Sequence, residues 1–595
     1  MKKLIALLLA AIMVFGLVAC GQKAPAGNEG DNGETAMTAE EKAAAEAEIR
    51  YAIGLLLDRN YIVESVSQAG EKPAASFVAD GMADLNGGNF AENAGEGNGK
   101  GYYSVDKEAF EDNFAEAVEI LKKYYKYDET TGKFSGIPTL KYIYNTSDAH
   151  KAIAEYIQGA LDAVGITMTL ENQEWNTFLN TRKNGEYSVA RNGWVADYTD
   201  PICFLDMWVT ASGNNDVQFG KGAHEKLAIY DLDLTKYGYA DIKVENGTWA
   251  ETYDVLISTI KACTDDETRY ALMHVAEDML MSTGCLTPVY FYTDLYMLNP
   301  KVKGFYSIPL GYKYFQNTTV DGKGDSLSVC LASEPDTIDP ALNSAVDGAT
   351  MLSHLFSGLA KWSQKEDGTL EVVADCVTEL AEGVVNEDGT VTYTYTLKDG
   401  LKWSDGKALT AADFEFAWKR AASAELGADY GYMFEVVKGY GTDNKDDLAV
   451  KAIDEKTLEV TLNNAVAYWN ELLAFPTYFP VREDVVANES WATEAKTYVC
   501  NGAYTISAWE HDSVITMTKN ENYHGEVTMN ELKFYLSDDA NNMLTNYKNG
   551  DWLLIDDVPT NEIAALKTDY AEEFVIAGQI GTYYVCWNIN ESLLP

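Results

Sequence analysis

Positive charge is scarce in this sequence, which has 45 lysines and arginines against 92 acidic residues and a formal net charge of −47 at pH 7. No basic run occurs beyond the first three residues. Proteins that bind nucleic acid contact phosphates through clustered basic side chains, so this composition excludes nucleic acid as a partner. So acidic a surface also favours solubility and repels anionic membranes.

Histidine and cysteine are sparse and scattered. The six histidines and eight cysteines form no CxxC pair and no cluster with the spacing of metal ligands, so no metal is predicted. Seven cysteines follow residue 20. Because this number is odd, we predict buried free thiols rather than a disulfide framework.

Motifs of the common enzyme classes are missing. The sequence has no GxSxG elbow, no HExxH, no phosphate-binding loop and no glycine fingerprint followed by an acidic residue. We therefore predict neither a cofactor nor an enzyme. A hydrolase that uses two of the 92 carboxylates is the alternative, and turnover of labelled peptides would reveal it.

Long apolar runs are absent except at the N-terminus, where two lysines precede the apolar segment 4–18. The segment ends in Leu-Val-Ala before Cys20, which resembles a bacterial lipobox. We predict a lipoprotein signal peptide over 1–19 and lipidation of Cys20; an ordinary secretory signal with a chance cysteine is the alternative. The polar, glycine-rich sequence that follows predicts a flexible tether, which makes 20–42 the lipidated cysteine and its tether.

Strand-like and helical segments alternate through the chain. A strand at 139–144, a helix at 148–164 and a strand at 166–170 follow one another. A helix at 266–282 then precedes an apolar strand at 286–292. This order predicts an α/β fold.

A short polar junction at 321–325 divides the chain into two unlike halves of similar length. A strand at 326–331 and a helix at 345–360 follow the junction, which indicates that a new structural segment begins there. We therefore predict structural segments over 43–320 and 326–595.

The second half carries motifs that resemble the signature of the oligopeptide-binding proteins, the extracellular solute-binding components of peptide ABC importers. The matching stretches are LKDGLKWSDG (397–406), LTAADF (409–414), WKR (418–420), EPDTIDP (334–340) and NGAY (501–504).

The first half resembles the C-terminal part of the same family. Its matching stretches are NTSD (145–148), NQEW (172–175), FL (178–179), TR (181–182) and VAR (189–191), followed by Trp194, Asp197, Tyr198 and Pro201.

The resemblance therefore implies a circularly permuted chain, in which 43–320 corresponds to the family's C-terminal half and 326–595 to its N-terminal half. The alternative is the joining of two halves from different paralogues. Permutation requires the original ends, now joined through 321–325, to be neighbours. It also requires the new ends, the tail near Cys586 and the helix near Arg50, to lie side by side.

The resemblance implies a two-lobed clamp of the periplasmic-binding-protein type, with mixed sheets, a hinge and the ligand between the lobes. It implies an oligopeptide ligand, an ABC permease and ATPase as partners, and a monomer held outside the cell membrane by lipid. Other cargo is the first alternative: a dipeptide, a murein peptide, a nickel chelate or a sugar. A lipoprotein that senses peptides without delivering them is the second.

Three charged residues carry the implied recognition of peptide ends. By resemblance, Asp197 binds the peptide α-ammonium. Arg182 and Arg191 neutralise the C-terminal carboxylate, with ligand length deciding which one engages. His150 is the corresponding group for longer peptides. A loop-capping role for Asp197 and structural ion pairs for the arginines are the alternatives.

The remaining implied site residues shape the cleft. By resemblance, its wall carries Trp175, Trp194, Tyr292, Tyr430 and Tyr584, each of which has a core position as its alternative. The backbones of Gly193 to Val195 and of Ser344 to Val346 are expected to pair with an extended ligand as added strands.

The sequence departs from the family at three of these positions. Val195 and Gly581 stand where some relatives have two cysteines, so rigidity there must come from packing. Ser344 stands where some relatives have an acidic residue, which leaves its part in ammonium binding open.

Overall fold

The computed structural model describes residues 37–95, 101–222, 229–322, 325–442 and 444–594. The predicted signal peptide, Cys20 and most of the predicted tether lie outside these residues. The tether is predicted to reach residue 42, but helix α2 (Ala39–Leu55) already begins at Ala39. Thr38 and Glu41 form a capping box there, which fixes the start of the helix.

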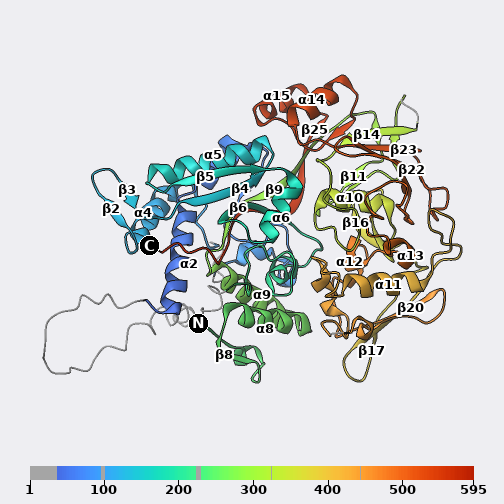
Figure 1. Ribbon diagram of the computed structural model, residues 1–595, viewed down its shortest axis with the longest axis horizontal. Coiled ribbons are helices and arrows are strands. Elements are labelled where there is room, and N and C mark those ends of the chain that lie inside the picture. Colours follow the sequence, from blue (N-terminus) through green and yellow to red (C-terminus); the bar gives the residue numbers. More distant parts are fainter. Residues whose placement is uncertain (1–36, 96–100, 223–228, 323–324, 443, 595) are drawn as a thin grey trace.

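A large mixed sheet joins the two lobes (Figure 1). Within the described residues it has eleven strands, ten of them on a continuous path and β1 (Lys72–Pro73) paired to β9 beside it. The path runs through β21 (Tyr504–Glu510), β22 (Val514–Lys519), β23 (Glu531–Tyr535), β14 (Ser326–Cys330), β24 (Leu554–Ile555), β9 (Leu286–Leu298), β25 (Phe574–Trp587), β6 (Val189–Val195), β4 (Leu140–Asn145) and β5 (Met168–Gln173).

The long strands β9 and β25 connect the lobes. They pair antiparallel from Met297–Phe574 to Leu286–Cys586, with register shifts between Gly578 and Thr582 and at Tyr583–Tyr584. One end of β25 also pairs with β6, and the far end of β9 pairs with β24. The predicted strand 286–292 is therefore too short. It continues past Asp294 because Lys313 neutralises that buried carboxylate at 2.8 Å.

The first lobe contains β4, β5, β6 and several helices. These include α2, α4 (Phe110–Leu121), α5 (Asp148–Ala163), α6 (Trp175–Lys183), α8 (Trp249–Ala262) and α9 (Asp266–Met281). Of these helices, α5 contacts β4 and β5, and α6 contacts β4. The prediction of a helix at 148–164 is confirmed to within one residue. Ser147 caps α5 through the amide of His150, and the apolar side chains of one face, such as Ile153 and Ile157, are buried.

The second lobe holds the motifs of the chain's second half. It contains α10 (Val346–Leu355), α11 (Ala411–Ala421), α14 (Ala540–Asn549), α15 (Ile563–Asp569) and a sheet of β17 (Val384–Val385), β18 (Val391–Thr396), β20 (Thr457–Leu462) and β19 (Val450–Ala452). Trp403 and Trp418 of those motifs are fully buried.

The predicted helix 345–360 is too long. It ends at Leu355, Phe356 is extended, and β15 (Ala360–Gln364) follows. The side chain of Asn501 accepts from the Ser357 amide at 3.1 Å and donates to the Ser357 carbonyl at 2.9 Å, which holds the chain away from the helix.

The C-terminal tail lies against α2 (Figure 1). The Leu593 amide and the Ser592 hydroxyl both donate to Glu46 Oε1, at 3.2 and 2.9 Å. Tyr125 Oη donates to the Leu593 carbonyl at 2.5 Å. This is the juxtaposition that a permuted chain order requires.

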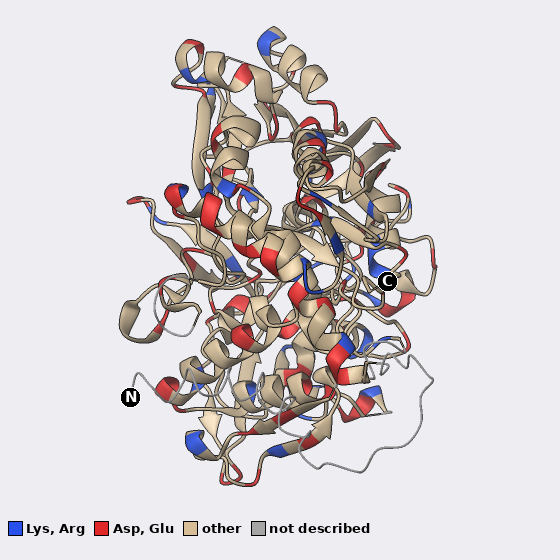
Figure 2. Ribbon diagram, turned by 90° about the vertical axis from the view of Figure 1, so that its left-hand side faces the viewer, with Lys and Arg blue, Asp and Glu red and all other residues tan. Residues whose placement is uncertain are grey.

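The positions of the acidic residues and of the cysteines agree with what the composition predicts. Figure 2 shows acidic residues spread over the whole view, with basic residues scattered among them. All seven cysteines after residue 20 are buried, as predicted. Among the described residues, no helix has the length and apolar character needed to cross a membrane.

Candidate functional site

A cavity of about 380 Å³ lies between the lobes. Its wall on the first lobe comes from α6, β6 and the loop that leads into α5. Its wall on the second lobe comes from the segment after β14, the start of α10, and Tyr430 and Phe475. The cavity thus uses segments from both halves of the sequence.

Twelve of the thirteen predicted site residues line this cavity. They are His150, Trp175, Arg182, Arg191, Gly193, Trp194, Val195, Asp197, Tyr292, Ser344, Val346 and Tyr430.

Tyr584 is the exception, and its predicted place in the cleft wall is wrong. It is fully buried in the first lobe, where its ring meets Phe77 and Trp208 edge-on at 5.1 and 6.2 Å between centroids. Successive side chains of a strand point to opposite faces. Its neighbour Tyr583 therefore lies on the other face of β25, where it stacks on Tyr290 at 4.7 Å.

Asp197 lies two residues beyond the end of β6 and is 7% exposed. Tyr430 Oη donates to its Oδ1 at 2.9 Å, whereas its Oδ2 is buried and has no hydrogen-bond partner among the described residues. Burial raises the pKa of Asp197 well above its usual range, against the opposing hydrogen bond from Tyr430. The carboxylate is thus oriented from one side and open on the other, which suits a cationic group.

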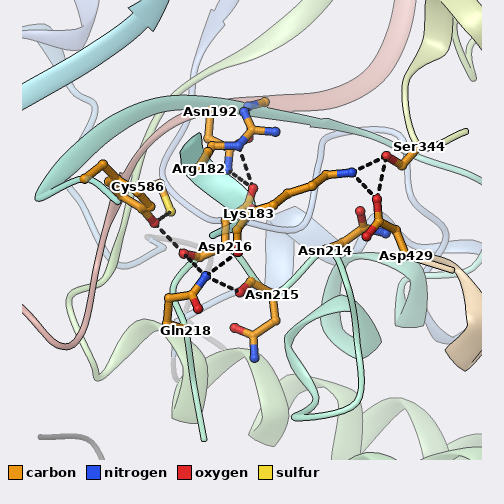
Figure 3. Close-up of polar contacts among 12 residues, drawn as sticks. Arg182, Lys183, Asn192, Asn214, Asn215, Asp216, Gln218, Ser344, Asp429 and Cys586 are labelled. Carbon is orange, nitrogen blue, oxygen red and sulfur yellow. Dashed lines mark hydrogen bonds and ion pairs between the residues drawn. The ribbon is translucent and has the colours of Figure 1, made fainter. Parts of the chain in front are cut away.

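Arg182 is already paired. Its Nε lies 2.7 Å from Asp216 Oδ2, and Asn192 Nδ2 donates to the same oxygen at 2.9 Å (Figure 3). The structural ion pair, given above as the alternative, therefore applies to Arg182. Sequence reasoning missed Asp216, because nothing in its local sequence marks it as a partner 34 residues away.

Arg191 has no carboxylate partner among the described residues. Its Nη2 donates to Tyr292 Oη at 3.2 Å, and its guanidinium lies 5.3 Å from the centre of the Tyr583 ring. Its Nε is buried without a hydrogen bond to any described residue. Arg191 is consequently the cation of the wall that remains available to an anion.

Gly193 makes room for this arrangement. A Cβ at Gly193 would lie 2.1 Å from Tyr292 Oη, the atom that accepts from Arg191. The second edge of β6 pairs with β4 only at Val189 and Ala190. The remainder of that edge, 191–195, is left for another strand, which is the geometry of strand addition.

His150 does not supply the charge predicted for it. Burial, and then the positive charge of Arg191, lower the pKa of His150 well below its usual range. The ring is therefore neutral at pH 7. It lies 5.6 Å from the Tyr583 ring and can contribute a hydrogen bond but no cation.

The second-lobe segment is only partly extended. Ala345 is extended, with φ −129° and ψ 149°, but Val346 is the first residue of α10. The backbone of Ala345 therefore suits the predicted strand-like pairing, whereas that of Val346 does not. Across the sheet, Val195 and Gly581 are direct partners on β6 and β25, so ladder hydrogen bonds hold these strands together there.

Lys183 joins the lobes and was not predicted. From the end of α6 its ammonium contacts Asp429 Oδ2 and Ser344 Oγ, and Ser344 donates to Asp429 at 3.0 Å (Figure 3). Ser344 is thus occupied by an interlobe contact. Trp194 and Tyr430 add an aromatic contact between the lobes, at 6.1 Å between ring centroids.

Comparison with known proteins gives one family. The family model described as bacterial extracellular solute-binding proteins, family 5 middle, matches residues 24–216 and 375–594. Among similar curated proteins, the oligopeptide-binding protein OppA of Bacillus subtilis strain 168 is 34% identical over 264 residues, covering 42% of this chain and 47% of that protein. The dipeptide-binding protein DppE of the same strain is 30% identical over 265 residues, covering 44% and 40%.

Solved structures give matches of the same extent. OppA of Listeria monocytogenes, bound to peptide, is 27% identical with a TM-score of 0.36, covering 39% of this chain and 46% of that one. OppA of Burkholderia pseudomallei is 28% identical with a TM-score of 0.38, covering 42% and 49%. The chain spans about half the length of the relatives it matches.

Proposed function

Since the chain belongs to family 5 of the bacterial extracellular solute-binding proteins, we propose that it captures oligopeptides between its lobes and delivers them to an ABC importer. The family consists of binding proteins of transport systems rather than enzymes, so we propose no catalytic activity.

The observation that carries this proposal is the pair of uncompensated charges at the two ends of one open strand edge. Asp197 and Arg191 lie six residues apart on and beyond β6. At about 3.3 Å per residue they are at most about 20 Å apart, the length of an extended peptide of about six residues. A zwitterionic peptide would offer its ammonium to Asp197 and its carboxylate to Arg191.

Between these ends the cavity favours recognition of the peptide backbone. The free edge at 191–195 offers main-chain donors and acceptors, which do not depend on the side chains of a ligand. Trp175 and Trp194 would provide apolar walls for those side chains. This combination supports broad specificity for oligopeptides over a sugar or a nickel chelate.

Titration calorimetry with tri- to pentapeptides in free, N-acetylated and C-amidated forms tests the proposal. Removing one charge-assisted contact should weaken binding about 10- to 100-fold. Asp197→Asn should weaken binding of free-amine peptides to that extent and cancel the effect of acetylation. Asp336→Asn, at an exposed carboxylate outside the cavity wall, is the matched control.

Equal affinity for free and doubly blocked peptides would refute recognition of the termini. Tight binding of dipeptides alone would support the dipeptide alternative. Release of labelled fragments during incubation would point to the hydrolase alternative.

We also propose that lipid on Cys20 holds the protein at the outer face of the cell membrane as a monomer. Cys20→Ser should release it from membrane fractions, and light scattering should give the mass of one chain. Genes for a permease and an ATPase beside its own would support delivery; their absence would favour peptide sensing.

We further propose that the two halves stand in permuted order. The family model matches one stretch in each half, and the tail contacts α2 through Glu46. A variant rebuilt in the order 326–595 then 43–320, with the tail joined to α2, should bind the same peptides with similar affinity. Failure of this variant to fold would contradict the permutation.

A further inference from the structure

The charges on the cavity wall fall into paired and unpaired groups. Arg182 pairs with Asp216 and Lys183 with Asp429. Asp556, at the far end, pairs with Lys313 at 2.8 Å. The ends of a zwitterionic peptide would compensate Asp197 and Arg191, as proposed above.

One further carboxylate on the wall remains uncompensated. Asp347 lines the cavity from the first turn of α10. Both of its carboxylate oxygens are buried and have no hydrogen-bond partner among the described residues. Trp175 Nε1, on the opposite lobe and also at the cavity wall, is buried as well, and its N–H is near enough to Asp347 to lower the pKa of that carboxyl.

The other acidic residues of the wall differ from Asp347. Asp538 is exposed, so water solvates it. Asp557 accepts from the Val558 amide at 2.7 Å, and burial raises its pKa to about 7, so it carries less charge than Asp347 at neutral pH. Burial raises the pKa of Asp347 to about 6, against smaller opposite effects of the amides in the first turn of α10 and of the Trp175 N–H. The carboxylate is therefore ionised in most molecules at neutral pH although no cation among the described residues pairs with it.

Burying a carboxylate without a cationic partner raises the free energy of the protein, and a cation bound beside it would lower that free energy again. A bound peptide that contains lysine or arginine would bring a second cation into this cavity besides its α-ammonium, which would be used at Asp197. We propose that Asp347 forms a subsite for a cationic side chain of the peptide, so that the protein prefers ligands containing lysine or arginine. This inference rests on the proposed function. The Trp175 ring beside the subsite would favour the same kind of side chain.

A lysine scan of tetra-alanine, matched position by position with a norleucine scan, tests the inference by calorimetry. Norleucine keeps the aliphatic chain and removes the charge. For wild-type protein we expect at least one position at which lysine binds about tenfold or more tightly than norleucine. In Asp347→Asn that ratio should fall to about two or less. Asp336→Asn removes a nearby exposed carboxylate outside the wall and should retain the ratio.

The outcomes separate this inference from the proposed function. If no peptide binds the wild type, both are refuted. If the norleucine peptides bind but no position favours lysine, the subsite alone is refuted, and this comparison requires no variant. A lysine preference that persists in Asp347→Asn also overturns the subsite. If acetylation weakens binding to the wild type but not to Asp347→Asn, Asp347 holds the α-ammonium instead and the inference fails.

Discussion

The ion pair between Lys183 and Asp429 should stabilise the closed arrangement of the lobes. Lys183 belongs to α6 of the first lobe, and Asp429 lies beside Tyr430 in the second. Their side chains are 18% and 23% exposed, so solvent screens the pair only in part. Because the contact requires both lobes, it is lost when they separate. Its free energy therefore contributes to ligand binding through closure.

A double-mutant cycle measures this contribution. Charge-assisted hydrogen bonds of partly buried groups contribute about 1.5–3 kcal/mol, and partial exposure reduces the expected coupling to about 1–2 kcal/mol. Lys183→Met and Asp429→Asn should each weaken peptide affinity about 5- to 30-fold, and the double variant should be little weaker than either single variant.

Calorimetry with one free tetrapeptide provides the affinities, and small-angle scattering should show a larger radius of gyration for the ligand-free variants. The control is Arg420–Asp339, an ion pair at 2.7 Å within the second lobe. A double-mutant cycle of this control pair should give a coupling energy in the free energy of unfolding but none in peptide affinity. A Lys183–Asp429 coupling below about 0.3 kcal/mol in affinity would refute the reasoning, because it is within the additivity of independent sites.

Three further predictions follow from buried groups. Burial raises the pKa of Glu277 to about 8, so the native state binds more protons than the unfolded chain between about pH 4.5 and 8. The free energy of unfolding, measured by denaturant titration, should therefore fall as pH rises through that window. In Glu277→Gln this fall should be smaller. Gly193→Ala should displace Tyr292 and weaken peptide binding about tenfold without a similar loss of thermal stability, whereas unchanged affinity would contradict the contact described above. Lys313→Met leaves two aspartates without their shared cation and should destabilise the fold by about 3–5 kcal/mol in chemical unfolding, a loss that neutralising Asp294 as well should partly reverse.

The local sequence was sufficient to predict elements whose signals are local. α5 is such an element, because its serine cap and its apolar spacing lie within 17 residues. The helix from 345 was overextended because the side chain that ends it, Asn501, is 144 residues away. Likewise, β9 contains the buried Asp294, whose charge is neutralised by Lys313. Because Lys313 lies outside β9, the local sequence does not show this compensation.

The site shows the same division. Motif resemblance was sufficient to predict twelve wall residues, since motifs preserve the positions of side chains. It placed Tyr584 on the wrong face of β25, because successive side chains of a strand point to opposite faces and Tyr584 points into the core of the first lobe. It also missed Lys183 and Asp429, which are 246 residues apart, and the burial that leaves His150 neutral.

The contacts of the site join residues from the two halves of the chain. Asp197 precedes the 321–325 junction, whereas its partner Tyr430 follows it, and Lys183 and Asp429 are divided in the same way. β25 lies between β9 and β6, so strands from both halves alternate in one sheet. Each half alone would therefore present an incomplete cavity wall and an unpaired strand edge. The binding site depends on both halves docking, and the contact of the tail with Glu46 is part of that docking.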